Sequence, residues 1–263
     1  MDLGLHDKTA LVFGASGGLG GAIARTLAAE GARVVLAGRN AAALTALRDE
    51  LVAAGKTAMA LPWDLADLSV IDARIGAIEQ APGFGPVDIL INNTVGPPPT
   101  TAAGQDPALW SAQFQAMVLS VIAITDRVLP GMRARGWGRI ITSTSSGVVA
   151  PIPNLAISNS LRMALVGWSK TLAREIGADG VTANIVLPGR VATPRIAFLD
   201  QQKASRDGAS VDTVRAASTQ AIPVGRYGDP EEYGAAVAFL ASRQAAYITG
   251  SVLRVDGGLI PSI

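Results

Sequence analysis

The sequence predicts a single α/β domain built on a doubly wound parallel sheet of about seven strands, with helices on both faces. Three observations lead to this prediction. Short runs rich in Val, Ile and Leu alternate with longer Ala-rich helical patterns, the short runs lack polar alternation, and a glycine-rich turn follows the first of them. Strands that are apolar on both faces belong to a sheet covered on both sides, and strand–helix–strand repeats with right-handed crossovers make it parallel.

The expected strands are residues 9–13, 33–37, 57–61, 87–92, 139–143, 182–187 and 252–255, and the expected helices are residues 18–30, 41–54, 68–80, 107–135, 155–176 and 230–242. No linker divides the chain, so residues 1–263 form one domain. Residues 189–223 depart from the alternation because they are polar and turn-rich. We predict a substrate loop there, over the carboxyl edge of the sheet. A surface loop without a function is the alternative.

The composition excludes several classes of protein. Charged residues make up 16%, the net charge is +1 and no run of Lys or Arg occurs, so we expect no nucleic-acid partner. With no Cys and only His6, we also expect no metal site. The N-terminus lacks a signal-peptide pattern, and the apolar run 117–125 is shorter than a membrane span, so we expect a cytoplasmic protein without membrane contact.

The turn after the first strand has the pattern of a dinucleotide-binding Rossmann fold. Gly14 allows a tight turn, Gly18 allows the backbone to approach a pyrophosphate, and Gly20 allows the helix to pack closely. The following helix presents free N–H groups and a partial positive charge to phosphates. The residues expected to bind there are Gly14, Ser16, Gly17, Gly18, Leu19 and Gly20.

The end of the second strand predicts which dinucleotide is bound. Sites for NAD commonly carry an acidic residue here, which accepts hydrogen bonds from the ribose 2′-hydroxyl. Gly38 stands in that place, and the next residue, Arg39, can pair with a 2′-phosphate. We therefore expect NADP(H) in preference to NAD(H). The alternative is a surface arginine that caps the next helix.

The spacing Gly-x-x-x-Gly-x-Gly resembles the short-chain dehydrogenase/reductase family, and in particular its 3-oxoacyl-ACP reductases; Phe13 replaces the family's usual Thr. The resemblance continues in the segments 92–96, 188–193, 225–232, 247–250 and 255–258, with Thr94 and Val95 departing from the family's Asn-Asn-Ala-Gly motif. It implies that further residues contact the cofactor. These are Asp64 and Leu65 at the adenine, Arg162 at the ribose, and Asn92, Pro188, Gly189, Val191 and Thr193 towards the nicotinamide.

The same resemblance implies a catalytic Ser, a Tyr thirteen residues later and a Lys four residues after that. Ser145 matches the Ser, but Ser158 and Arg162 stand at the Tyr and Lys positions, and Met117 stands at the family's helical Asn. A phenol has a pKa of about 10 that a nearby cation can lower, whereas an aliphatic hydroxyl is a much weaker acid. An arginine keeps its charge and cannot relay a proton.

Three functions remain open. The protein is a reductase that takes its proton through Ser145, Ser158, water or the substrate, or an NADP(H)-binding sensor or regulatory subunit with little catalysis, or a protein with non-redox chemistry on this scaffold. The expected lining favours a small, moderately apolar carbonyl or imine-like substrate, and Arg190 and Arg195 are candidates for receiving a carboxylate. No tyrosine is an obvious spatial substitute for the missing one. The resemblance also implies a homotetramer, or a homodimer, formed through helices 107–135 and 155–176 and the last strand.

Overall fold

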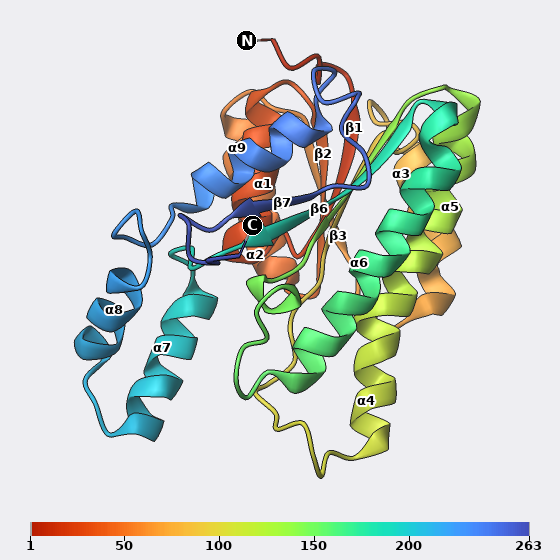
Figure 1. Ribbon diagram of the computed structural model, residues 1–263. Helices are drawn as coiled ribbons and strands as arrows, with labels where there is room; N and C mark the ends of the chain where they lie inside the picture. Colours follow the sequence, from red (N-terminus) through yellow and green to blue (C-terminus); the bar gives the residue numbers. More distant parts are fainter. Residues whose placement is uncertain (1, 263) are drawn as a thin grey trace.

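The structure is a computed structural model that describes residues 2–262. Its centre is one sheet of seven parallel strands in the order β3-β2-β1-β4-β5-β6-β7, with helices on both faces (Figure 1). The strands are β1 (Thr9–Phe13), β2 (Arg33–Gly38), β3 (Ala58–Pro62), β4 (Ile89–Asn93), β5 (Gly138–Ser143), β6 (Val181–Pro188) and β7 (Val252–Val255). Every predicted strand is present to within two residues at each end, and the predicted fold class is confirmed.

The helices form two layers. One face of the sheet carries α1 (Gly18–Ala29), α2 (Ala41–Ala53) and α9 (Pro230–Ala241), and the other carries α3 (Ile71–Gln80), α5 (Ser120–Ala134) and α6 (Ala156–Ile176). Alternate residues of β1 enter the two cores: Ala10 and Val12 face the first layer, and Leu11 and Phe13 face the second. This double burial explains why the strands read as continuous apolar runs. Short 3-10 turns, η1 (Leu68–Val70), η3 (Ser146–Val148) and η4 (Gly177–Asp179), complete this part of the chain.

The strand order reverses beside β1, which lies between β2 and β4. In doubly wound sheets, such a switch point opens a crevice at the carboxyl ends of the strands, where ligands bind. Figure 1 shows α4 (Pro107–Phe114) and α7 (Pro194–Asp207) on either side of that edge.

The predicted helix 107–135 is interrupted by a π-helical segment, η2 (Gln115–Leu119), between α4 and α5. Gln115 Nε2 donates to the carbonyl oxygen of Ala66 at 2.6 Å and ties this segment to the loop after β3. Met117 is buried among Ile157, Leu161 and other apolar side chains, so it packs η2 against α6. Contrary to expectation, the stretch Pro107–Ala134 is long and apolar enough to cross a membrane by length and composition alone. The core helix of a soluble protein can have the same length and composition, and 33% of the most apolar window of this stretch is buried.

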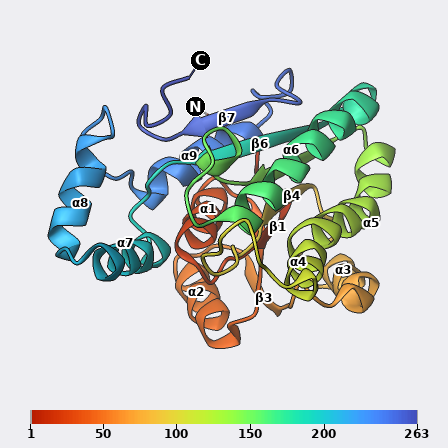
Figure 2. The same ribbon diagram turned by 60° about the horizontal axis from the view of Figure 1, so that its bottom comes forward.

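Residues 189–223 are not the loop that their polarity predicts, because they contain α7 and α8 (Val211–Gln220). Thr193 caps α7 and Pro194 follows it, Gly208 ends α7 in the left-handed region, and Ser210 caps α8. The two helices stand apart from the sheet beside β6 and β7 (Figure 2). Few of their side chains are buried, so the apolar periodicity that reveals a helix in sequence is weak here.

Candidate functional site

Close backbone approaches shape the turn between β1 and α1. Gly14 has a φ of 64°, in the region that favours glycine. A Cβ atom at Gly20 would lie 2.2 Å from the carbonyl oxygen of Gly14, and one at Gly18 would lie 2.6 Å from the Thr193 methyl carbon. The turn therefore requires glycine at all three positions, and Gly18 adjoins the segment that follows β6.

The N-terminus of α1 is free to bind an anion. Its N-cap residue, Gly17, offers no capping side chain, and the first turn contains no acidic residue. Ser16 and Gly17 are exposed and Leu19 is half-buried. The uncapped N–H groups and the partial positive charge of the helix thus face the crevice, as phosphate binding requires.

Phe13, which departs from the family pattern, is accommodated by packing. Its ring meets Trp63 edge-on, with 5.0 Å between ring centroids and 72° between planes. Its carbonyl oxygen accepts a hydrogen bond from Asn93 Nδ2 at 3.2 Å. The side-chain amide of Asn93 therefore braces the turn after β1.

The glycine-rich turn and the end of β2 meet at one corner. A Cβ atom at Gly38 would lie 3.3 Å from Ser16 Oγ. Arg39 is exposed at this corner, and Asn40, not Arg39, caps α2 by accepting a hydrogen bond from the backbone of Ala43 at 3.1 Å. The alternative of Arg39 as the helix cap is thereby removed, so its guanidinium is available to a ligand phosphate.

The loop after β3 borders the same crevice. Asp64 is exposed, and its Oδ1 accepts a hydrogen bond from the backbone of Ala66 at 3.0 Å. Leu65 is half-buried against the core beneath α3. Asp64 thus shapes the loop with one oxygen and presents the other to solvent.

Polar groups lie beneath the crevice at the ends of β4 and β5. Asn92 is 1% exposed and donates to Thr142 Oγ1 at 3.4 Å, whereas its Oδ1 and the buried hydroxyls of Thr94 and Thr144 have no hydrogen-bond partner among the described residues. Unpaired buried polar atoms are costly, and such atoms at the floor of a crevice suit a polar ligand or water.

The segment after β6 closes the far side of the crevice. A Cβ atom at Gly189 would lie 2.5 Å from the Cα atom of Asp256, so the chain leaves Pro188 in close contact with the end of β7. Val191 is buried and pairs with Gly228. Thr193 caps α7 beside the glycine-rich turn. The Val191 side chain is thus packed against the segment at Gly228, and Thr193 faces the turn; the contact of both residues with the cofactor stays a prediction.

Ser158 and Arg162 lie one turn apart on α6 and are both buried. Arg162 Nε donates to Ser158 Oγ at 3.3 Å, and its two Nη atoms donate to the carbonyl oxygens of Ser143 at 3.2 Å and Thr94 at 2.9 Å. Burial lowers the pKa of Arg162 to about 10, with Tyr233 raising it and Arg195 lowering it. The guanidinium therefore stays charged at neutral pH.

Ser145 starts the loop between β5 and α6. It is half-buried, and its Oγ accepts a hydrogen bond from the backbone of Gly147 at 3.1 Å. Asn159 Nδ2 holds the same loop by donating to the carbonyl oxygen of Ile152 at 2.9 Å. Because the Ser145 oxygen is an acceptor in this contact, its hydroxyl proton remains available to a ligand.

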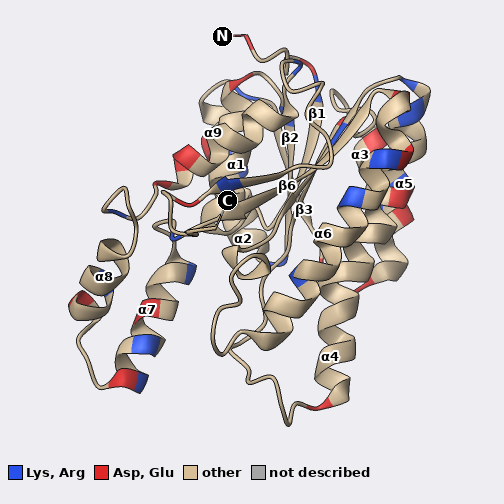
Figure 3. Ribbon diagram, viewed as in Figure 1, with Lys and Arg blue, Asp and Glu red and all other residues tan. Residues whose placement is uncertain are grey.

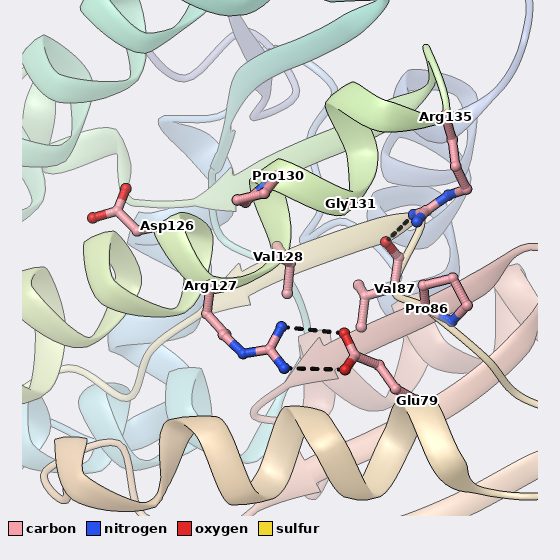
Figure 4. A pocket seen from close by; sticks show the side chains of 9 residues that line it. All are labelled: Glu79, Pro86, Val87, Asp126, Arg127, Val128, Pro130, Gly131 and Arg135. Carbon is pink, nitrogen blue, oxygen red and sulfur yellow. Dashed lines mark hydrogen bonds and ion pairs between the residues drawn. The ribbon is translucent and has the colours of Figure 1, made fainter.

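Two surface hollows lie away from the Ser158–Arg162 pair. One, of about 340 Å³, lies between α3 and α5, where Figure 4 shows Arg127 paired with Glu79 and Arg135 directed at Val87. The other, of about 430 Å³, lies beside β7 and is lined by Arg226, Asp256 and neighbouring residues. Neither hollow contains Ser158 or Arg162.

Comparison with known proteins agrees with the fold and the glycine-rich turn. A family model described as Enoyl-(Acyl carrier protein) reductase matches residues 14–260. The chain is 38% identical over 259 residues to the 3-oxoacyl-[acyl-carrier-protein] reductase FabG of Vibrio cholerae, covering 98% of this chain and 99% of that one. The chain belongs to the short-chain dehydrogenase/reductase family.

Solved structures of this family superpose over nearly the whole chain. The L-sorbose reductase of Gluconobacter frateurii, complexed with NADPH and L-sorbose, matches with a TM-score of 0.93 and 30% identity and covers 100% of both chains. An actinorhodin polyketide ketoreductase variant with NADPH matches with a TM-score of 0.90 and 33% identity, covering 96% of this chain and 97% of that one. These neighbours are reductases.

None of the three tyrosines takes the place that the family resemblance gives to a Tyr. Tyr247 is fully exposed, and Tyr227 donates to Asp200 Oδ2 at 2.8 Å. Tyr233 comes nearest: its hydroxyl lies 2.7 Å from Ser143 Oγ and 3.2 Å from the Val186 carbonyl oxygen. However, Tyr233 is completely buried on the inner face of α9, and burial raises its pKa, which makes it a poor proton donor.

The two candidate arginines of the α7 segment have different roles. Arg190 Nη1 donates to Asp200 Oδ1 at 2.6 Å, and the side chain of Asp200 is 4% exposed. Arg190 is thereby committed to an ion pair and does not receive a ligand carboxylate. Arg195 Nη2 donates only to the carbonyl oxygen of Pro97, at 3.2 Å, and lies beside the Ser158–Arg162 pair. Sequence reasoning gave no signal for Asp200 or for the neighbourhood of Tyr233.

Proposed function

We propose that this protein is an NADP(H)-dependent oxidoreductase that acts on a small, moderately apolar carbonyl or imine-like substrate. The observation that carries the proposal is that the uncapped α1 terminus after β1, Arg39 after β2, and Arg162, which donates to carbonyl oxygens at the ends of β4 and β5, all lie at the carboxyl edge of one sheet. The NADPH named in the titles of the solved L-sorbose and actinorhodin reductases supports the same cofactor here.

The residues present fit this cofactor. The glycine-rich turn leaves no room for a Cβ atom, and the first turn of α1 offers unpaired N–H groups to a pyrophosphate. Arg39 is free to pair with a 2′-phosphate beside Ser16 and Gly38. When bound, NADP(H) supplies or accepts the hydride. Arg162 has two N–H bonds beyond the three it uses, and these suit ribose hydroxyls or a substrate oxygen.

The chain's own residues then hold the substrate oxygen and stabilise the negative charge on it. Ser158 Oγ accepts a hydrogen bond from Arg162, so the proton of the Ser158 hydroxyl is directed away from Arg162. Ser145 offers a second hydroxyl. Arg162 stabilises negative charge on the substrate oxygen without giving up a proton. Proton delivery therefore passes through a hydroxyl and water, with less acid assistance than a phenol provides.

Cofactor choice is tested by fluorescence titration with NADPH and NADH. We expect NADPH to bind about 10- to 100-fold more tightly, since a guanidinium–phosphate hydrogen bond is charge-assisted. Arg39→Ala removes this preference, whereas Arg48→Ala, an exposed arginine of α2 that pairs with Asp49, keeps it. Equal affinities in the wild type, or an unchanged preference in Arg39→Ala, contradict the proposal.

The reaction is tested by restoring the family's residues. Ser158→Tyr with Arg162→Lys should raise turnover on simple ketones by about 10²-fold or more, the contribution of a positioned general acid. Ordinary ketone reduction by the wild type contradicts the account of a weakened acid.

The second candidate function is NADP(H) binding with little catalysis. The burial of Tyr233 favours it, and tight NADPH binding without turnover of any ketone or imine would support it.

We also propose a cytoplasmic homotetramer, with a homodimer as the smaller alternative. The stretch Pro107–Ala134 is strongly apolar, yet only 33% of its most apolar window is buried in one chain. Figure 3 shows α4 without charge along its length, and Phe114, Leu119 and Met163 are exposed on α4, η2 and α6. A second copy that covers this face would bury those side chains. Light scattering after gel filtration should give four or two chains, and a monomer contradicts the proposal.

A further inference from the structure

Three polar groups converge on one point beside Gly96, in the loop after β4. From the position that a Cβ atom would take at Gly96, Arg162 Nη2 lies at 3.6 Å, Ser158 Oγ at 3.8 Å and Arg195 Nη2 at 3.9 Å. Ser158 and Arg162 come from α6, and Arg195 comes from the first turn of α7. The three groups therefore gather around the side of Gly96 that carries no side chain.

The two guanidinium groups at this point have no anion from the chain. Arg162 donates to Ser158 and to the carbonyl oxygens of Thr94 and Ser143, and Arg195 donates to that of Pro97. Among residues 2–262, neither arginine forms an ion pair.

Arg190 and Arg226 differ in this respect. Arg190 pairs with Asp200 at 2.6 Å, and Arg226 pairs with Glu232 at 2.6 Å. The proximity of Arg195 also lowers the pKa of Arg162, as expected for two cations at close range. Placing an exposed guanidinium close to a buried one is unfavourable, and an anion that binds between the two offsets that cost.

We infer that the substrate carries a carboxylate beside its carbonyl group, as in a 2-oxo acid, and that Arg195 and Arg162 bind it. This inference rests on the proposed function and names its substrate class. One carboxylate oxygen pairs with Arg195 on the open side of the crevice. The other lies towards Arg162, and the adjacent oxo oxygen accepts from Ser158 Oγ. Planar carboxylates match the fork of N–H groups on arginine.

The same arrangement lessens the need for a strong acid. In the reduction, the oxo carbon accepts a hydride, the oxo oxygen accepts one proton from water through Ser158, and NADPH is oxidised to NADP⁺, which gives a 2-hydroxy acid. Arg162 stabilises the negative charge that develops on the oxygen before the proton arrives. A hydroxyl and a guanidinium together thus serve a substrate whose own carboxylate fixes its orientation.

A cofactor phosphate is the other anion within reach, since Thr193, two residues before Arg195, touches Gly18 in the glycine-rich turn. The test therefore measures the two ligands separately. Calorimetry on NADPH-loaded protein compares the binding of oxamate, a charged 2-oxo acid analogue, with that of oxamide, its uncharged counterpart. A separate titration measures the binding of NADPH to the free protein. Arg195→Gln is the test variant. Arg206→Gln is its matched control, because Arg206 lies on the same helix and pairs only with the exposed Asp207.

We expect oxamate to bind about 10- to 100-fold more tightly than oxamide, as a charge-assisted pair provides. Arg195→Gln should abolish this difference and leave NADPH affinity within about twofold, Arg195→Lys should restore part of it, and Arg206→Gln should behave as wild type. Equal binding of oxamate and oxamide overturns the inference. So does a tenfold loss of NADPH affinity in Arg195→Gln with oxamate preference retained, which would assign the site to the cofactor.

If NADPH does not bind at all, the proposed function fails on its own, and the free protein still decides the anion site. Oxamate preference that depends on Arg195 in the free protein then supports a carboxylate site without redox chemistry. If the free protein shows no oxamate preference, both the proposed function and the inferred carboxylate site are overturned. The circular dichroism spectrum of each variant separates loss of folding from loss of binding.

Discussion

Removing the carboxylate of Asp200 should loosen α7 from the rest of the domain. Asp200 is buried at 3% exposure and holds two partners from outside α7, with Arg190 Nη1 at 2.6 Å and the Tyr227 hydroxyl at 2.8 Å. Asp200→Ala leaves the guanidinium without its counter-ion and the phenol without its acceptor. Because α7 carries Arg195, its attachment also positions that arginine in the crevice.

The magnitude follows from the burial of each partner. Removing one member of a buried ion pair costs about 3–5 kcal/mol. The Arg190 side chain is 27% exposed, so water replaces part of the lost interaction, and we expect about 2–4 kcal/mol. With a denaturant slope of about 2 kcal/mol per molar urea, the unfolding midpoint should fall by about 1–2 M.

The assay is urea unfolding followed by tryptophan fluorescence, together with limited proteolysis of the α7–α8 segment. Asp207→Ala is the matched control, since Asp207 lies on the same helix in an exposed pair with Arg206, and such pairs contribute about 0–1 kcal/mol. The assignment of Asp200 as the anchor of α7 is wrong if two results are found together. The free energy of unfolding of Asp200→Ala lies within about 0.5 kcal/mol of the wild-type value, given a measurement error of about 10%, and its α7–α8 segment resists proteolysis as well as that of the wild type.

Three further changes have defined outcomes. Gly20→Ala places a Cβ atom 2.2 Å from the Gly14 carbonyl oxygen, so NADPH titration should show lost binding, and unchanged affinity would disprove the need for glycine there. Phe13→Ala opens a cavity beside Trp63 and should cost about 3–5 kcal/mol in urea unfolding. The charge of Arg162, whose pKa is about 10, is lost as pH rises through that value, so oxamate affinity should be constant from pH 7 to about 9 and fall above about pH 10. A fall centred near pH 8 would assign the effect to another group.

The strands and the glycine-rich turn could be predicted because local sequence determines them. Leu11 and Val12 enter opposite cores, so β1 is apolar from Ala10 to Phe13. Gly14 is required by its positive φ, and Gly20 by its contact with the Gly14 carbonyl oxygen six residues earlier. The two helices at 194–220 were missed because polarity outweighed their capping residues. Thr193 and Ser210 stood in the sequence as N-caps, but few of the side chains that follow them are buried.

The partners of the arginines could not be predicted, because tertiary packing sets them. Arg190 and Arg195 were equal candidates for a carboxylate in the sequence. In the structure, the orientation of α7 gives Asp200 to Arg190 and leaves Arg195 beside Arg162. Likewise, nothing in the sequence places Tyr233 beneath Ser143, since that contact depends on how α9 packs on the sheet.

Ser158 and Arg162, at the positions where the family resemblance implies a Tyr and a Lys, favour a different chemistry. A phenol near an ammonium group is a proton donor, whereas a hydroxyl near a guanidinium chiefly stabilises negative charge. Arg162 holds Ser158 from a buried position with no acidic partner, and Arg195 adds a second charge at the rim. Such a site gains most from a substrate that brings its own anion, because the carboxylate neutralises the cations and orients the carbonyl.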